Sequence, residues 1–123
     1  MEKDRFSFEK LDVWQEAICF ADQCLDVVEN LKTDRKHYRL IEQLESAATS
    51  VALNIAEGKG RFSKKEFVLF LYIARGSLFE TITLLEIFRR RKWIGDTYFR
   101  ETKEAAVVLG RRISALINSI KKP

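Results

Sequence analysis

Residues that interrupt helices are scarce in this chain, because its 123 residues include only one proline and five glycines. Proline breaks the interior of a helix and glycine weakens it, so their scarcity predicts long helices with few interruptions. A chain of this length is typical of a single hydrophobic core. We therefore expect one domain over residues 1–123.

Long uncharged stretches are also missing. The N-terminal residues 1–5 are mostly charged, and no apolar stretch typical of a secretory signal follows them. No uncharged run approaches the roughly 18–20 residues that a membrane-spanning helix needs. The sequence thus predicts a cytoplasmic protein with no membrane partner.

Side chains that usually carry catalysis or bind metals are few. His37 is the only histidine, and no glutamate stands three residues before it, as the Glu-x-x-His motif of di-iron bundles requires. We expect His37 to be a solvated loop residue. Cys19 and Cys24 lie five positions apart, which suits neither a C-x-x-C pair nor a zinc knuckle and predicts buried free thiols. No phosphate-loop or nucleophile-elbow pattern occurs, so we predict no catalytic residue, no metal and no cofactor.

Charge is distributed unevenly along the chain. Residues 1–30 contain three basic and eight acidic residues, a balance of −5, which leaves 19 basic and 10 acidic residues, a balance of +9, for the remainder. A basic excess confined to part of a small domain indicates a polyanionic partner.

Apolar residues recur at the three- and four-residue spacing of amphipathic helices in four segments. They predict helices over about residues 11–31, 38–58, 63–92 and 96–120. The apolar stripe of the first helix contains Leu11, Trp14, Ile18, Ala21, Leu25 and Val28. Short connections make an antiparallel, up-down-up-down four-helix bundle the simplest topology, so we predict an all-α fold.

Three residues mark the predicted ends of these helices. Ser63 with Glu66 forms an S-x-x-E capping box at the start of the third helix. Gly58 suits the position after the second helix, where a left-handed backbone favours glycine. Asp96 is expected to cap the fourth helix.

The third predicted helix is apolar on nearly every side from Phe67 to Ala74, and apolar residues continue to Phe88. A helix that is apolar all round must bury more than one face. In a four-helix domain the second face has to meet something outside the monomer, and we therefore expect a homo-oligomer.

Basic residues gather in three places, and each is a candidate for contacts with nucleic-acid phosphates. They are Lys59, Arg61, Lys64 and Lys65 around the second turn, Arg89, Arg90, Arg91 and Lys92 after the third helix, and Arg111 and Arg112 on the fourth. Each cluster taken singly is also typical of a solvated helix end. No recognition-helix, RRM or zinc-finger pattern occurs, so base-specific recognition is not predicted.

A polar set interrupts the apolar pattern at Asn54, Glu57, Arg75 and Glu80. An arginine inside an apolar helix needs a carboxylate partner, which favours an ion pair that fixes the register of helices or subunits. A ligand site is the alternative. Arg75 lies further from the turn than Glu57, so contact between them would need a neighbouring subunit.

Several motifs in the same order resemble one known family. They are residues 10–15 (KLDVWQ), Gln43 with Ala47 and Ala48, residues 54–58 (NIAEG), Arg61, and residues 70–78 (FLYIARGSL) with Glu80. Together they resemble the four-helix-bundle proteins encoded in bacterial 23S ribosomal RNA intervening sequences and, more distantly, the accessory protein of diversity-generating retroelements. The resemblance implies a homopentamer with no established enzyme activity. The first loop, residues 32–36, lacks the aromatic-Pro pair common in that family.

Two functions are compatible with the sequence. The first is a non-enzymatic homo-oligomer that binds structured RNA or DNA, indicated by the basic excess and the resemblance. The alternative is a scaffold or accessory subunit for other proteins, in which the apolar third helix and the acidic first helix bind partners.

Overall fold

The structure, a computed structural model, describes residues 6–33 and 37–123. A short 3-10 helix, η1 (Ser7–Lys10), precedes α1 (Asp12–Glu29), α2 (Tyr38–Lys59), α3 (Lys64–Arg90) and α4 (Asp96–Lys121). The described residues thus contain four α-helices and no strand, which confirms the all-α class. Each α-helix begins and ends within two residues of its predicted position. Residues 34–36 of the first predicted connection lie outside the described residues.

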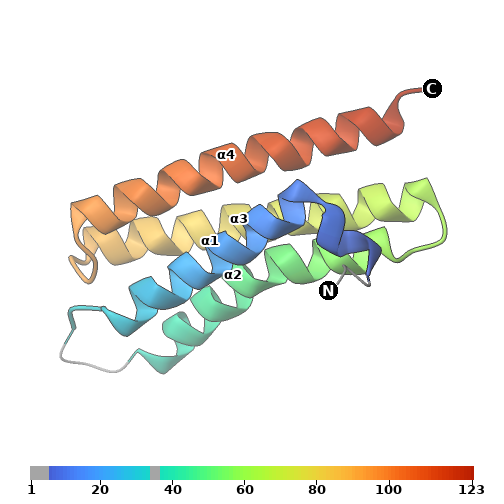
Figure 1. The fold of residues 1–123 in the computed structure, drawn as a ribbon. Helices are drawn as coiled ribbons and strands as arrows, with labels where there is room; N and C mark the ends of the chain where they lie inside the picture. Colours follow the sequence, from blue (N-terminus) through green and yellow to red (C-terminus); the bar gives the residue numbers. More distant parts are fainter. Residues whose placement is uncertain (1–5, 34–36) are drawn as a thin grey trace, which may run out of the picture.

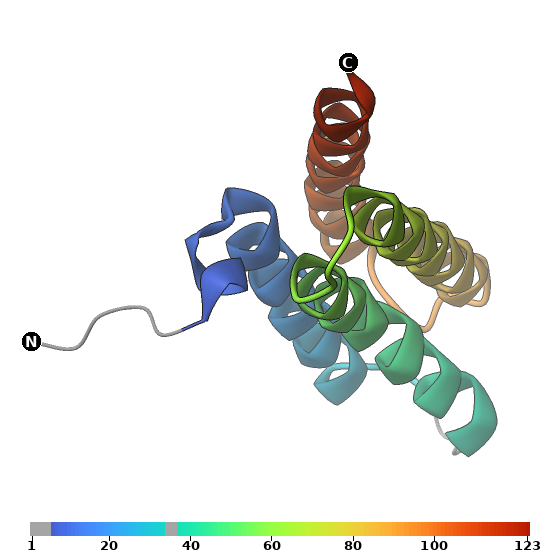
Figure 2. The same ribbon diagram turned by 90° about the vertical axis from the view of Figure 1, so that its right-hand side faces the viewer.

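The connections between the long helices lie at two opposite ends of the molecule (Figure 1). The α1–α2 and α3–α4 connections lie at one end, called here the loop end. The α2–α3 turn lies at the other, called here the turn end, together with the C-terminus. Figure 2, which views the helices nearly end-on, shows α2 between α1 and α3, and α4 beside α3.

The core is made by one stripe from each helix, and its largest side chains include Phe20 on α1, Leu44 on α2, and Leu85 and Phe88 on α3. No polar side-chain atom buried in the described part of the molecule lacks a hydrogen-bond partner. Folding therefore leaves no buried polar side chain unsatisfied in this part of the chain.

The predicted stripe of α1 lies at one edge of the buried face: Ala21 is buried, and Leu11, Trp14 and Val28 pack against the core. The residues that α1 buries are Val13, Ala17, Phe20, Ala21, Cys24 and Val27, whereas Ile18 of the predicted stripe is 42 % exposed. Apolar residues cover a wide arc of α1, so spacing alone allows two neighbouring stripes. Packing against α2 and α4 selects the one with small alanines and Phe20.

Gly58 does not end α2 in a left-handed conformation, contrary to prediction. It lies inside the helix and is buried, and none of the described glycines has a positive φ. A Cβ atom placed on Gly58 would lie 2.6 Å from the Cβ of Phe70 and 3.1 Å from Cδ1 of Phe67. The glycine is required because it lets α2 and α3 approach closely near the turn end.

At the start of α3, the structure contains one of the two hydrogen bonds of the predicted capping box, the one that the Ser63 side chain accepts. Ser63 is the N-cap, and its hydroxyl accepts a hydrogen bond from the backbone N–H of Glu66 at 3.1 Å. The same hydroxyl donates to the Glu66 carboxylate at 3.3 Å. Serine therefore satisfies an orphan amide of the first turn as expected. The prediction for α4 is wrong by one residue, because Gly95 is its N-cap and Asp96 its first residue.

The end of α3 is a Schellman motif built without glycine. Lys92 follows the C-cap and has a φ of 64°. Its backbone N–H donates a hydrogen bond to the carbonyl of Arg89 at 2.9 Å, and the N–H of Trp93 donates one to the carbonyl of Phe88 at 2.9 Å. The rings of Phe88 and Trp93 also contact each other, with centroids 5.0 Å apart. This hydrophobic contact commonly accompanies the motif and anchors the connection to the core.

His37 is not a solvated loop residue. It is half-buried, stands at the N-cap position of α2, and stacks on Trp93 with ring centroids 4.1 Å apart. The contact joins the α1–α2 connection to the α3–α4 connection at the loop end.

Helix α3 is long and apolar enough to cross a membrane by length and composition alone, and it is the only such helix in the described part of the chain. Core helices of soluble proteins can pass the same test. Seven of its residues are buried in this bundle: Leu71, Ala74, Leu78, Thr81, Leu84, Leu85 and Phe88.

Candidate nucleic-acid interface

The turn end gathers basic residues from three helices. Lys64 and Lys65, in the first turn of α3, line one shallow pocket with Lys121 from the end of α4, over Val68 and Ile120. All three lysines are exposed, and none forms an ion pair with a residue that the structure describes. Their positive charges are thus available to an outside anion.

The other two predicted cations of this end are held by their own neighbours. Arg61 pairs with Glu57 one helical turn earlier and lies over the ring of Phe70. Lys59 lies over Phe67, with 5.7 Å between Nζ and the ring centroid. The structure therefore places all four predicted residues at the turn end, but neutralises Arg61.

Lys121 was missed by the sequence analysis. It lies 56 residues after Lys65, and nothing in the local sequence links the two. Its ammonium group donates to the hydroxyl of Tyr72 at 3.3 Å, which ties the end of α4 to α3. Only the folded chain, in which the end of α4 lies beside the start of α3, reveals that these residues share a surface.

At the loop end, one carboxylate pairs with two of the four residues of the predicted basic run and offsets one of their positive charges. Glu86 accepts hydrogen bonds from both Arg89 and Arg90. These bonds hold the pKa of Glu86 below its usual range, so the carboxylate is ionised at neutral pH. Arg91 and Lys92 are exposed and have no carboxylate partner among the described residues. The loop end is therefore less basic than its sequence indicates.

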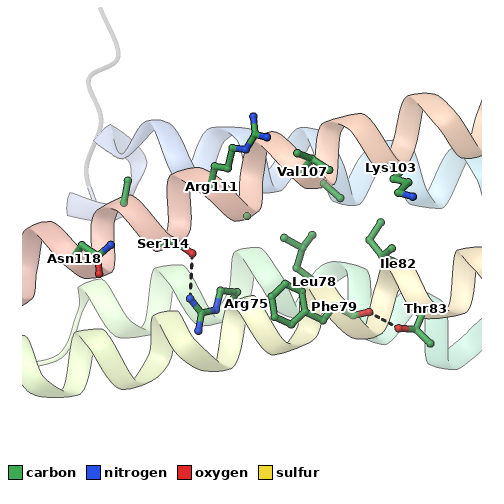
Figure 3. Close-up of a pocket in the computed structure, with 13 residues that line it drawn as sticks. Arg75, Leu78, Phe79, Ile82, Thr83, Lys103, Val107, Arg111, Ser114 and Asn118 are labelled. Atoms are coloured by element: carbon green, nitrogen blue, oxygen red, sulfur yellow. Dashed lines mark hydrogen bonds between the residues drawn. The ribbon is translucent and has the colours of Figure 1, made fainter.

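The two arginines of α4 have different surroundings. Arg112 pairs with Glu16 on α1, with 2.8 Å between Nε and Oε1. Arg111 is exposed and lines a groove between α3 and α4. In Figure 3 its guanidinium extends from α4 on the side away from α3. The predicted pair thus divides into a residue that joins two helices and a residue free to bind a partner.

The predicted polar cluster is not formed within one chain. Each of the four residues interacts with a residue outside the set. Asn54 donates to the backbone carbonyl and hydroxyl of Ser50, and Glu57 pairs with Arg61. Arg75 donates to Ser114 on α4, and Glu80 accepts from Gln43 on α2. Among the described residues, no hydrogen bond or ion pair joins the four to one another. Glu57 lies in the last turn of α2, whereas Arg75 lies about three turns into α3, further from the α2–α3 turn, as expected from the sequence. An interaction across subunits remains a proposal.

The two cysteines are free, as predicted, but only one is buried. Burial raises the pKa of the Cys24 thiol to about 12, so it is protonated at neutral pH. Cys19 is exposed on α1, contrary to expectation, because the buried stripe of α1 passes through Phe20 and Cys24. No group of three potential metal ligands occurs within residues 6–33 and 37–123.

The comparison with known families agrees with the motifs and with the four helices. The sequence model of the 23S rRNA-intervening sequence protein family matches residues 9–115. The chain belongs to this family. The match begins in η1 and ends within α4, so it includes both the α2–α3 turn and the basic run after α3.

A solved structure resembles this member of the intervening-sequence family closely in fold. It is a protein of unknown function of the S23 ribosomal protein family from Bacteroides thetaiotaomicron VPI-5482, with a TM-score of 0.79 and 22 % sequence identity. The similarity covers 85 % of this chain and 97 % of that one. At this identity the likeness concerns the fold alone. A search of curated proteins gives no match.

Proposed function

We propose that this intervening-sequence family protein is a non-enzymatic, up-down-up-down four-helix bundle that assembles as a ring-shaped homo-oligomer in the cytoplasm. In this proposal it binds structured RNA or DNA. The family's link to 23S rRNA supports a nucleic-acid partner, and the alternating connections in Figure 1 support the topology. A ring of five subunits is what the family resemblance implies.

One observation carries the nucleic-acid part of the proposal: Lys64, Lys65 and Lys121 form an exposed basic surface from two helices without a carboxylate partner. Phosphate contacts need only positive charge and reach, and they release counterions when they form. A ring would repeat this surface once per subunit, so a long polyanion could contact several copies.

Binding can be tested by retention of structured RNA and duplex DNA on filters over a range of salt concentrations. We expect retention at low salt and a steep loss of affinity as salt rises. Lys64→Gln with Lys65→Gln and Lys121→Gln should weaken binding and reduce the slope of log affinity against log salt by about three, one for each lost phosphate contact. No retention by the wild type at low salt would contradict the proposal.

A matched control removes two cations that share a carboxylate within the bundle. Arg89→Gln with Arg90→Gln removes two positive charges beside Glu86, and Lys64→Gln with Lys65→Gln removes two at the turn end. We expect the turn-end pair to weaken binding more than the loop-end pair. Equal losses would mean that net charge, and not the turn-end surface, determines binding.

The scaffold alternative rests on a different surface, the exposed apolar side of α3. Its large exposed residues are Leu69, Tyr72, Ile73, Phe79 and Ile87, which are 39 to 58 % exposed. Large exposed apolar residues that recur along one helix are typical of a protein interface. Partners that remain bound after nuclease treatment of a pull-down from the native host would favour the scaffold over nucleic-acid binding.

A further inference from the structure

A groove of about 750 Å³ runs between α3 and α4 and combines an apolar floor with cations at its sides (Figure 3). Arg75 and Lys103 lie between the two helices, whereas Arg111 lines the groove but extends its guanidinium away from α3. Leu78, Phe79 and Ile82 from α3 and Ala106 and Val107 from α4 supply apolar lining. Phe79 is 58 % exposed, so the groove is not closed within the chain. A surface of this kind fits a helix better than a small polar ligand.

Three cations line the groove, and no carboxylate does. They are Arg75 on α3 and Lys103 and Arg111 on α4. Arg75 is half-buried, donates to Ser114 at 3.1 Å and lies over the rings of Tyr72 and Phe79, and no described carboxylate pairs with it. A partly buried guanidinium without an anion is costly, so the groove is complementary to a partner that brings negative charge.

The same chain exposes such a partner on the outer side of α1. Its exposed residues fall on one helical stripe opposite the buried one: Gln15, Ile18, Cys19, Asp22, Asp26 and Glu29. The three carboxylates of this acidic stripe form no ion pair with any residue that the structure describes. Ile18, which is 42 % exposed, adds an apolar contact.

The two surfaces match in charge and in length. Asp22 and Glu29 are separated by about 10 Å along α1, and Lys103 and Arg111 by about 12 Å along α4, at 1.5 Å per residue. Within one chain α1 and α4 already meet through the Glu16–Arg112 ion pair. We infer that the acidic stripe of α1 from a second copy docks in the α3–α4 groove.

This contact is heterologous, because each copy contributes a groove to one neighbour and an α1 stripe to the other. Repetition of a heterologous contact produces a ring when the rotation closes. The inference rests on the proposed self-assembly and specifies its interface. Nucleic acid fits this groove less well than a helix does, because its phosphates would have to lie over an apolar floor.

Charge reversal of each surface alone should dissociate the assembly. We expect Lys103→Glu with Arg111→Glu, the groove variant, to have the mass of one chain by light scattering. Asp22→Lys with Asp26→Lys, the stripe variant, should behave in the same way. All four positions are exposed, so the fold should persist, and circular dichroism checks this. Lys10→Glu with Arg39→Glu, the same charge change outside both surfaces, should keep the wild-type mass.

Mixing the two variants tests the pairing itself. In a mixture of the two variants, the intact stripe of the groove variant faces the intact groove of the stripe variant, and the two reversed surfaces carry opposite charges as well. An equimolar mixture should therefore assemble again, to a mass above that of one chain. A chain that carries all four substitutions has complementary charges again and should regain the wild-type mass. An isologous contact through either surface gives the four-substitution chain the same reversed charges on both sides of the contact, so a four-substitution chain that keeps the mass of one chain would overturn the inference.

The outcomes separate this inference from the proposed function. A wild-type protein with the mass of one chain would overturn both the ring and the interface. If the wild type is an oligomer and both charge-reversal variants keep its mass, the proposed interface alone is overturned. Filter binding at low salt tests the nucleic-acid proposal independently of either result.

Discussion

At the scale of single residues, Lys92 shows how a functional prediction from sequence can hide a structural role. Among the non-glycine residues that the structure describes, it alone has a positive φ. The run from Arg89 to Lys92 reads as a basic cluster, yet Lys92 holds the left-handed position that connects α3 to the buried Trp93. The sequence could not show this, because glycine is the residue usually found there.

Lys92→Gly should stabilise the protein. A left-handed residue with a Cβ costs about 1–2 kcal/mol. Glycine avoids this cost, but it loses about 0.5–1 kcal/mol more than alanine in conformational entropy when the chain folds. We therefore expect the free energy of unfolding to rise by about 0.5–1 kcal/mol, measured by urea denaturation. Lys92→Ala removes the charge but keeps the Cβ, and should change little. An equal gain in both variants would attribute the effect to charge.

At the scale of elements, the positions of the helices could be predicted better than the faces that they bury. Sparse breakers and the cap at Ser63 define where helices begin and end. The buried face of α1 could not be predicted, because Ile18 and Phe20 lie in one broad apolar arc and only the neighbouring helices choose between them. Gly58 was placed near the correct helix end but given the wrong reason, since its role is contact with α3.

The close approach of α2 and α3 predicts opposite effects for two glycines. In Gly58→Ala the new methyl group would meet Phe70 at 2.6 Å, and we expect a loss of about 1–3 kcal/mol of stability from overpacking. In Gly76→Ala nothing lies within 4 Å of the new methyl group, so helix propensity should dominate with a gain of about 1 kcal/mol. Thermal unfolding followed by circular dichroism measures both. A Gly58→Ala variant as stable as the wild type would show that the phenylalanine can move aside.

At the scale of the whole molecule, the charge asymmetry visible in the sequence becomes a spatial one. Three acidic residues of the first 30, Asp22, Asp26 and Glu29, lie on an outer stripe of α1, and the basic clusters of the remainder lie at the turn end, at the loop end and along the α3–α4 groove. Sequence proximity identified Lys64 with Lys65, but Lys121 joined them only through the fold. It also grouped Arg89 and Arg90 with the candidates, because it could not show that Glu86 binds both.

Assembly through exposed surface predicts that stability depends on protein concentration. If the native state is an oligomer and the unfolded chain is a monomer, mass action favours the native state as concentration rises. Phe79 of α3, which is 58 % exposed and lines the α3–α4 groove, would be covered in that state. We expect the Tm of the wild type to increase over a roughly hundredfold rise in concentration, measured by scanning calorimetry.

The groove variant, Lys103→Glu with Arg111→Glu, provides the control for this dependence. As a monomer it should unfold at a Tm that does not change with concentration, and at low concentration its Tm should approach that of the wild type, because both substituted side chains are exposed. A wild-type Tm that is constant over the same range would mean that the apolar side of α3 stays exposed in the native protein. In that case the apolar surface would be available to a different protein, as the scaffold alternative requires.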